Sequence, residues 1–296
     1  MRSKDFGVVE GISRESSKEE TLEMFKRICL CRNFEFNVKK VFDQGLIKMP
    51  IYLSLGQESV AAALSVAFKN PAIFAQHRAH DLYLANGGDI TQLIDELLHR
   101  PTGCAGGMGG SASIHSPKIG MFGHDGLMGT QIPISVGYTL ATGKKTLAVM
   151  GDASAEEDYV HGAMAYGAHK KIPTLFVCTD NGLSILTKVE VRRNWKMVDV
   201  AKAYGMDTTE ITDDPWLIMH HAKKLKLPAF MNVHTSRHLW HSGTGVDGPP
   251  EWDRFQMIKE EMTRLGLATE AENIEKEAKE FVDGVWEKQL ALGVRD

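Results

Sequence analysis

The sequence predicts an α/β fold, a parallel sheet with helices on both faces. Three observations lead to this prediction. Downstream of Gln131, the short apolar runs TLAVM, PTLFVC and PAFMNV alternate with segments of helical periodicity. These runs are apolar throughout, as is typical of parallel strands that are buried on both faces. The length of 296 residues suits one large α/β domain better than several small ones.

Composition and charge exclude several classes of protein. The chain is 24% charged and 43% hydrophobic, which is ordinary for a globular protein, and its net charge of −4 offers no basic field for nucleic acid. No apolar run approaches the roughly 20 residues of a membrane-spanning helix. The polar first residues predict no secretory signal, and four cysteines without metal-ligand spacing predict reduced thiols. We therefore expect a cytoplasmic protein that binds neither nucleic acid nor membrane.

The first part of the chain is mainly helical. Residues 1–16 show little periodicity and are predicted to form an N-terminal arm. Ser17 and Glu20 make a capping box at the start of a long helix, which Gly45 ends. The next predicted elements are a buried helix over GQESVAAALSVAF, a strand over PAIFAQ, a loop from His77 to His80, and a helix that begins at Asp89 or Thr91.

A glycine-rich loop separates this part from the alternating part. Five glycines between Gly103 and Gly110 predict a mobile or phosphate-near loop. Helices are then predicted over QIPISVGYTLAT, AEEDYVHGAMAYGAHK, WKMVDVAKAYG and PWLIMHHAKKLK. Residues 17–250 would form the α/β domain, and residues 251–296 a charged, peripheral helical tail.

Polar residues follow two of the predicted strands. Asp152 follows TLAVMG, and Asn181 comes one helix and one strand later. Ligands bind at the carboxyl ends of parallel strands, and carboxylate and amide oxygens suit Mg²⁺ that is shared with a diphosphate. A helix that starts near Ala155 would point free amides at the same place. A cap on that helix is the alternative role of Asp152, and spacing alone leaves both open. Acids predicted to serve the helix dipole are Glu156, Glu157 and Asp158.

The stretch from Asp152 to Asn181 resembles the thiamine diphosphate motif, in which Gly-Asp-Gly is followed, after a helix and a strand, by Asn-Asn. Seven segments occur in the order of one family: LGQESVAAAL, HRAHDLYLANG, GGMGGS, GHDGLMGTQIP, GDASAEED, PTLFVCTDNGLSI and AKAYGM. Between about Glu20 and Asp247 the chain thus resembles the α subunit of the decarboxylating first component of 2-oxo acid dehydrogenase complexes. The pyruvate, branched-chain and acetoin enzymes belong to this group.

The resemblance implies roles for individual residues. Asp152, Asn181 and the backbone carbonyl of Leu183 would bind Mg²⁺. His241 would orient the diphosphate and move protons at the reacting centre. His77 would be a hydrogen-bond donor at a position where the family has Tyr. The diphosphate would be bound by Arg78 and by the backbone amides of Ala153 and Ser154. Backbone atoms of Gly126 and Met128 would contact the aminopyrimidine, and Ile185 would be the apolar wedge that keeps the cofactor bent.

Besides His77, four positions depart from the family pattern. Gly-Asp-Gly ends in Ala153, which requires a backbone compatible with a Cβ atom. Asn-Asn becomes Asp180-Asn181, and Asp180 adds a negative charge near the diphosphate unless it is turned away or paired. Ser113 stands where the family has His, and Gly162 where it has Glu. The departures leave the cofactor expected, and the choice of 2-oxo acid and acceptor open.

The resemblance implies a half-enzyme. Its activity would be decarboxylation of a 2-oxo acid and transfer of the acyl or aldehyde unit, with thiamine diphosphate as the electron sink. The glutamate that contacts the aminopyrimidine belongs to a separate β subunit in this family, so a heterotetramer is implied, with a lipoyl-bearing acyltransferase as a further partner. Two alternatives stay open: a split transketolase-like ketol or acyl transferase subunit acting on a ketose, and a non-catalytic paralogue that lost the cofactor.

Overall fold

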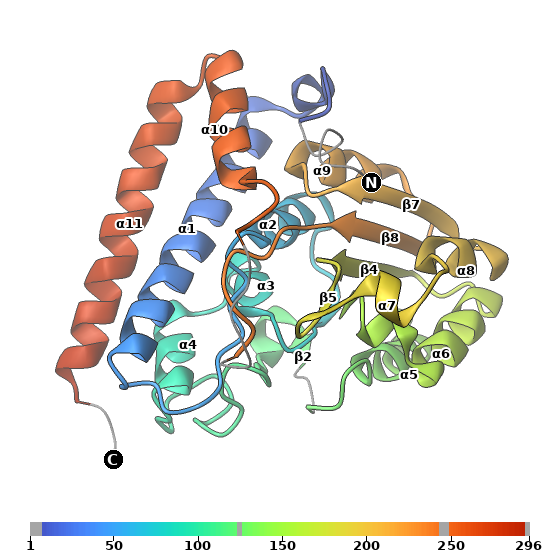
Figure 1. Cartoon of the computed structure of the whole chain (residues 1–296), viewed down its shortest axis with the longest axis horizontal. Helices are drawn as coiled ribbons and strands as arrows, with labels where there is room; N and C mark the ends of the chain where they lie inside the picture. Colours follow the sequence, from blue (N-terminus) through green and yellow to red (C-terminus); the bar gives the residue numbers. More distant parts are fainter. Residues whose placement is uncertain (1–7, 123–125, 243–248, 294–296) are drawn as a thin grey trace.

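A parallel six-stranded sheet lies at the centre of the molecule (Figure 1). The computed structural model describes residues 8–122, 126–242 and 249–293. In the order β2-β1-β3-β4-β8-β7, the strands are Met121–Phe122, Ala72–Phe74, Thr146–Gly151, Thr174–Asp180, Ala229–His234 and Asp207–Thr212. The predicted parallel sheet with helices on both faces is confirmed.

Two hydrophobic cores lie on the two faces of this sheet. Successive residues of a strand point to opposite faces, so Leu147 and Val149 of β3 join the larger core, and Ala148 and Met150 join the smaller one. The helices of the larger core are α1 (Lys18–Asp43), α2 (Glu58–Ala67), α3 (His80–Ala85), α4 (Ile90–Leu97), α9 (Pro215–Lys224), α10 (Arg254–Arg264) and α11 (Ala268–Ala291). Those of the smaller core are α5 (Gln131–Thr142), α6 (Asp158–His169) and α8 (Met197–Ala203).

The two ends of the described chain pack on this frame. The capping box of α1 is present as predicted, with the Ser17 hydroxyl and the Glu20 carboxylate each accepting from the other residue's amide. Helix α11 lies along α1 (Figure 1) and buries Val282 and Trp286 in the larger core. The C-terminal tail is helical as expected, but the expectation that it is peripheral was wrong, because its apolar stripe completes the core.

Other differences from the predictions lie near the sheet edges. The polar stretch Asp207–Thr212 forms the edge strand β7, which the search for apolar runs missed. The helix expected near Ala155 begins at Asp158, because the 3-10 turn η4 (Ser154–Glu156) precedes it. Beyond β4 the chain forms a small hairpin, β5 (Leu183–Ser184) and β6 (Thr187–Lys188), and then the short helix α7 (Val189–Arg192). Among the described helices, none is long and apolar enough to cross a membrane.

Candidate functional site

The ends of β3 and β4 bring the predicted cation ligands to one edge of the sheet. Gly151 pairs in register with Thr179, so Asp152 and Asp180 leave the two strands side by side. Asp152 is buried, and burial, followed by the negative charge of Asp180, raises the pKa of its carboxyl to about 7. Asp152 caps neither η4 nor α6, whose N-cap positions are Ala153 and Glu157. The capping alternative for Asp152 is therefore not supported.

Arginines from the segment beyond β6 compensate the acids at this edge. Arg192 forms a short ion pair with Asp152 through Nη2 and donates from Nη1 to Glu156 Oε1 at 2.6 Å. Arg193 Nε lies 3.2 Å from the same Glu156 oxygen. Glu156 was expected to serve the helix dipole, but it binds these two guanidinium groups instead. Sequence reasoning missed both arginines, because the segment has no periodicity that would place it over the site.

Asn181 and Asp180 are held in fixed and different orientations. Asn181 Oδ1 accepts from the amide of Leu183 at 3.1 Å, and its Nδ2 donates to Gln57 Oε1 at 3.1 Å. Asp180 accepts from Asn232 Nδ2 at 3.1 Å and from the amide of Gly182 at 3.0 Å. Asp180 is thus hydrogen-bonded within the protein, as a carboxylate that is paired would be, while its negative charge still acts on Asp152.

The donor set of this edge fits a hard divalent cation. Asp152 supplies a carboxylate directly after β3, and Asn181 an amide oxygen directly after the neighbouring strand β4. These are ligand types that Mg²⁺ prefers, together with backbone carbonyls and phosphate oxygens. Within the described residues no group of three or more His, Cys, Asp or Glu side chains forms a metal site, and the predicted set is not of that kind. Cation binding by Asp152, Asn181 and Leu183 stays a prediction.

A second cluster brings together residues of three loops, which lie before α2, after β1 and after β8. Arg78 Nη2 donates to His241 Nδ1 at 3.1 Å, and Arg78 Nη1 makes a short hydrogen bond to the carbonyl of Leu53. The ring of Tyr52 lies 4.7 Å from that of His77 and 5.3 Å from that of His241, between ring centroids. The predicted residues His77, Arg78 and His241 therefore come together, and Tyr52, which the sequence reasoning did not single out, packs against both histidine rings.

Hydrogen bonds connect this second cluster to the edge of the sheet that carries Asp152 and Asn181. Gln76, two positions before Arg78, donates to Thr179 Oγ1 at 2.7 Å, and Thr179 lies at the end of β4. Gln57 accepts from Thr235 Oγ1 at 2.9 Å as well as from Asn181. The loops after β1, β4 and β8 are thus connected at one edge, which supports a single site.

A buried network of hydrogen-bonded polar residues supports these loops. Glu35 of α1 accepts from the hydroxyl of Ser54 at 2.5 Å and contacts His80 Nδ1 at 3.0 Å. His80 Nε2 lies 2.9 Å from the hydroxyl of Ser111, which accepts from the amide of Tyr52 at 2.9 Å. This network fixes the backbone on both sides of Leu53, whose carbonyl accepts the hydrogen bond from Arg78.

The glycine-rich loop is filled by the protein's own carboxylate. The two oxygens of Glu96, on α4, accept hydrogen bonds of 2.7 to 2.9 Å from four backbone amides, those of Ala105, Gly107, Gly109 and Gly110. These amides are not available to a phosphate, so a phosphate-near role for them was a wrong expectation. The glycines are required there because Gly107 and Gly110 have positive φ angles of 76° and 60°.

The remaining predicted residues lie around the same edge. Ala153 has φ −75° and ψ −42°, a conformation that accepts a Cβ atom, so its departure from glycine causes no strain. The carbonyl of Met128 accepts a short hydrogen bond from the hydroxyl of Tyr159. Ile185 has a positive φ of 54°, which is rare for a β-branched residue and indicates local strain. The others are Ser154, whose hydroxyl bonds Gly151, and Gly126, which has φ 90° and borders residues outside the described part.

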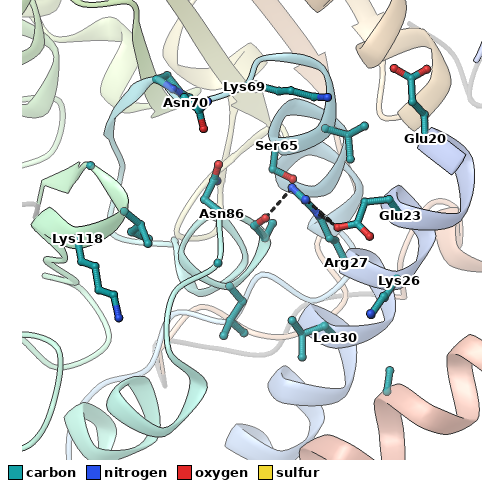
Figure 2. A pocket seen from close by; sticks show the side chains of 18 of the residues that line it. Glu20, Glu23, Lys26, Arg27, Leu30, Ser65, Lys69, Asn70, Asn86 and Lys118 are labelled. Carbon is teal, nitrogen blue, oxygen red and sulfur yellow. Dashed lines mark hydrogen bonds and ion pairs between the residues drawn. The ribbon is translucent and has the colours of Figure 1, made fainter.

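A separate groove of about 1350 Å³ lies at the opposite, amino-terminal end of the strands (Figure 2). Its wall includes Pro71 and Ala72 at the start of β1 and Lys144 before β3. Figure 2 shows Lys118 at the left of the groove, Lys69 at the top and the Glu23–Arg27 ion pair at the right. None of the predicted site residues lines this groove, so it is not part of the site described above.

Comparison with known proteins agrees with this geometry. A family model described as "Dehydrogenase E1 component" matches residues 26–242. The α-1 subunit of the mitochondrial pyruvate dehydrogenase E1 component of Arabidopsis thaliana is 28% identical over 92% of this chain and 76% of its own length. The corresponding α subunit of Zymomonas mobilis is 29% identical over 77% of this chain and 69% of its own length.

Solved structures of similar fold include transketolases. The transketolase of Campylobacter jejuni superposes with a TM-score of 0.57 at 14% identity and covers 93% of this chain. That of Leishmania mexicana has a TM-score of 0.51 at 12% identity and covers 92% of this chain. The chain spans about half the length of these two enzymes, 49% and 47%. At this level of identity the likeness shows the fold alone.

Proposed function

The chain belongs to the dehydrogenase E1 component family, and from this premise we propose that it is the α subunit of a thiamine diphosphate- and Mg²⁺-dependent 2-oxo acid dehydrogenase. The enzyme decarboxylates a 2-oxo acid and transfers the acyl unit to an acceptor, a lipoyl-bearing acyltransferase, and it acts with a separate β subunit in a heterotetramer. The cytoplasmic location remains a prediction, since relatives of the chain include proteins named as mitochondrial.

One observation carries this proposal: Asp152 and Asn181, which directly follow the neighbouring strands β3 and β4, share a sheet edge with the Arg78–His241 pair. Asp152 and Asn181 hold the cation, and Arg78 holds the diphosphate through its guanidinium group. When bound, thiamine diphosphate supplies the electron sink for the loss of CO₂. Arg78 donates to His241 Nδ1, so the neutral ring carries its proton on Nε2, the nitrogen that can donate at the reacting centre.

Native mass spectrometry of the chain purified from its own cells, in Mg²⁺ and thiamine diphosphate, tests the proposal. We expect an assembly with a second chain, bound cofactor, and decarboxylation of pyruvate or a branched-chain 2-oxo acid. Removal of Mg²⁺ with EDTA should abolish the activity, and added Mg²⁺ should restore it. Normal decarboxylation by the chain alone would disprove the half-enzyme.

The same preparation separates the two alternative functions. Activity with ketose phosphates and none with 2-oxo acids would identify a transketolase-like subunit. A melting temperature that Mg²⁺ and thiamine diphosphate do not raise, with the partner chain present, would identify a paralogue without cofactor.

A further inference from the structure

Arg192 binds the carboxylate that the proposed function assigns to the cation. The side chain of Arg192 is only 13% exposed, and its two terminal nitrogens contact Asp152 and Glu156. A guanidinium bound to Asp152 Oδ2 excludes a dication from the same oxygen, because the two positive charges repel each other at contact distance in a partly buried site. Arg192 and Mg²⁺ therefore compete for one ligand.

The segment that carries Arg192 is weakly anchored. Helix α7 is a single turn with no buried residue, and Val191 within it is 75% exposed. The hairpin before it is only two residue pairs long and contains the strained Ile185. Segments with few buried apolar contacts open at low free energy, so the ion pairs supply much of what keeps this segment in place.

The arginines themselves are incompletely satisfied. Among the described residues, buried Arg192 Nε, Arg193 Nε and Arg193 Nη1 have no hydrogen-bond partner, although Arg193 Nε lies 3.2 Å from Glu156 Oε1, so the closed arrangement leaves these donors incompletely satisfied. Trp195 completes the closed segment: its ring lies under the Arg193 guanidinium at 4.8 Å and 5.4 Å from the ring of His161 on α6. The arrangement is thus well defined but not strongly favoured, as expected of a contact that is broken and remade.

We propose that Arg192 is an internal counter-ion of the cation site, and that binding of Mg²⁺ with thiamine diphosphate displaces it from Asp152 and opens the segment 186–195. The inference rests on the proposed function, because it takes Asp152 as the cation ligand. Arg192 then lowers the apparent affinity for the cofactor by the fraction of molecules in the closed arrangement. In return, it compensates the buried Asp152 and the half-buried Glu156 whenever the cofactor is not bound.

Calorimetry on the assembled enzyme, stripped with EDTA, tests the competition. We expect Arg192→Gln to lower the dissociation constant for Mg²⁺–thiamine diphosphate by about tenfold, which corresponds to about 90% closed molecules in the native protein. Lys188→Gln is the matched control: it removes one positive charge from the same segment, but Lys188 is exposed and pairs only loosely with Glu190, at 3.9 Å. The control should leave the constant within about twofold.

Hydrogen exchange of the unmodified enzyme gives a second readout that needs no variant. Peptides covering residues 186–195 should exchange faster after Mg²⁺–thiamine diphosphate is added, while peptides of β4 stay protected. Equal or weaker cofactor binding by Arg192→Gln, or slower exchange in 186–195, would overturn the inference and leave the proposed function standing. If neither the native enzyme nor the variant binds the cofactor, the proposed function fails, and the inference fails with it.

Discussion

Glu96 and Asp152 are both buried carboxylates, but the protein compensates their charges in different ways. Glu96 is surrounded by four backbone amides of one loop, whose glycines adopt the conformations that aim these amides inward. Asp152 is compensated by one guanidinium from a separate, weakly anchored segment. Backbone donors of a folded loop cannot be exchanged without unfolding it, whereas a side-chain partner can move away.

This difference distinguishes Glu96, a structural acid, from Asp152, the proposed cation ligand. Burial and Asp180 keep the pKa of the Asp152 carboxyl near 7 even with Arg192 bound, so the ionised carboxylate there gains from a stronger counter-charge such as a dication. Glu96 already has its full set of donors and offers nothing to a ligand. Replacing each carboxylate by its amide should therefore affect different properties of the protein.

The largest effect is expected for Asp152→Asn. We predict that decarboxylation by the assembled enzyme falls at least about a hundredfold, equivalent to about 3 kcal/mol, because Asp152 is the one charged side chain among the three proposed cation ligands. The melting temperature without cofactor should change little, because the variant loses a costly buried charge together with its ion pair to Arg192. Asp158→Asn, an exposed change at the start of α6, serves as the control. Retained activity in Asp152→Asn would mean that the cation, if any, binds elsewhere.

A smaller effect, on stability instead of activity, is expected for Glu96→Gln. The amide nitrogen of glutamine cannot accept from the loop, so up to two backbone amides lose their acceptor, and the free energy of unfolding should fall by about 2–3 kcal/mol. Urea unfolding of the purified chain measures this change. Glu287→Gln, an exposed position of α11, should change it by less than about 0.5 kcal/mol. An unchanged midpoint in Glu96→Gln would show that the loop does not depend on its carboxylate.

The comparison also shows what the sequence could and could not predict. The apolar runs of β3, β4 and β8 and the capping box at Ser17 have local signals, and these elements lie where they were expected. The edge strand β7 has no such signal, because its polar residues face solvent on an outer position of the sheet. Its pairing with β8 is visible only in the folded structure.

The site was predictable to a similar extent. Strand ends could be identified, so Asp152 and Asn181 were found, and Arg78 and His241 followed from the family resemblance. Arg192 and Glu96 were not found, because their partners lie in other loops and no periodicity connects them. Ion pairs between loops depend on three-dimensional proximity, which residue spacing along one chain does not report.

The smallest effect on stability is expected at the edge strand β7, where water also solvates the charged groups. Glu210 on β7 accepts from His234 Nε2 at 2.9 Å and from Lys196 Nζ at 3.0 Å. The hydrogen bond from His234, and then that from Lys196, lowers the pKa of the Glu210 carboxyl from 4.5 to about 2. Because the folded-state pKa is lowered, this group stabilises the fold above about pH 4.5, and the contribution is lost as the pH falls toward 2.

Glu210→Gln should therefore lower the free energy of unfolding at pH 7 by only about 0.5–1 kcal/mol, the range of partly exposed ion pairs. The difference between variant and native chain should shrink as the pH falls from 4.5 to 2 and should also decrease with added salt. Urea unfolding at several pH values measures both dependences. A loss at pH 7 as large as that of Glu96→Gln would contradict the comparison, because it would mean that an acid shared with solvent matters as much as one enclosed by the backbone.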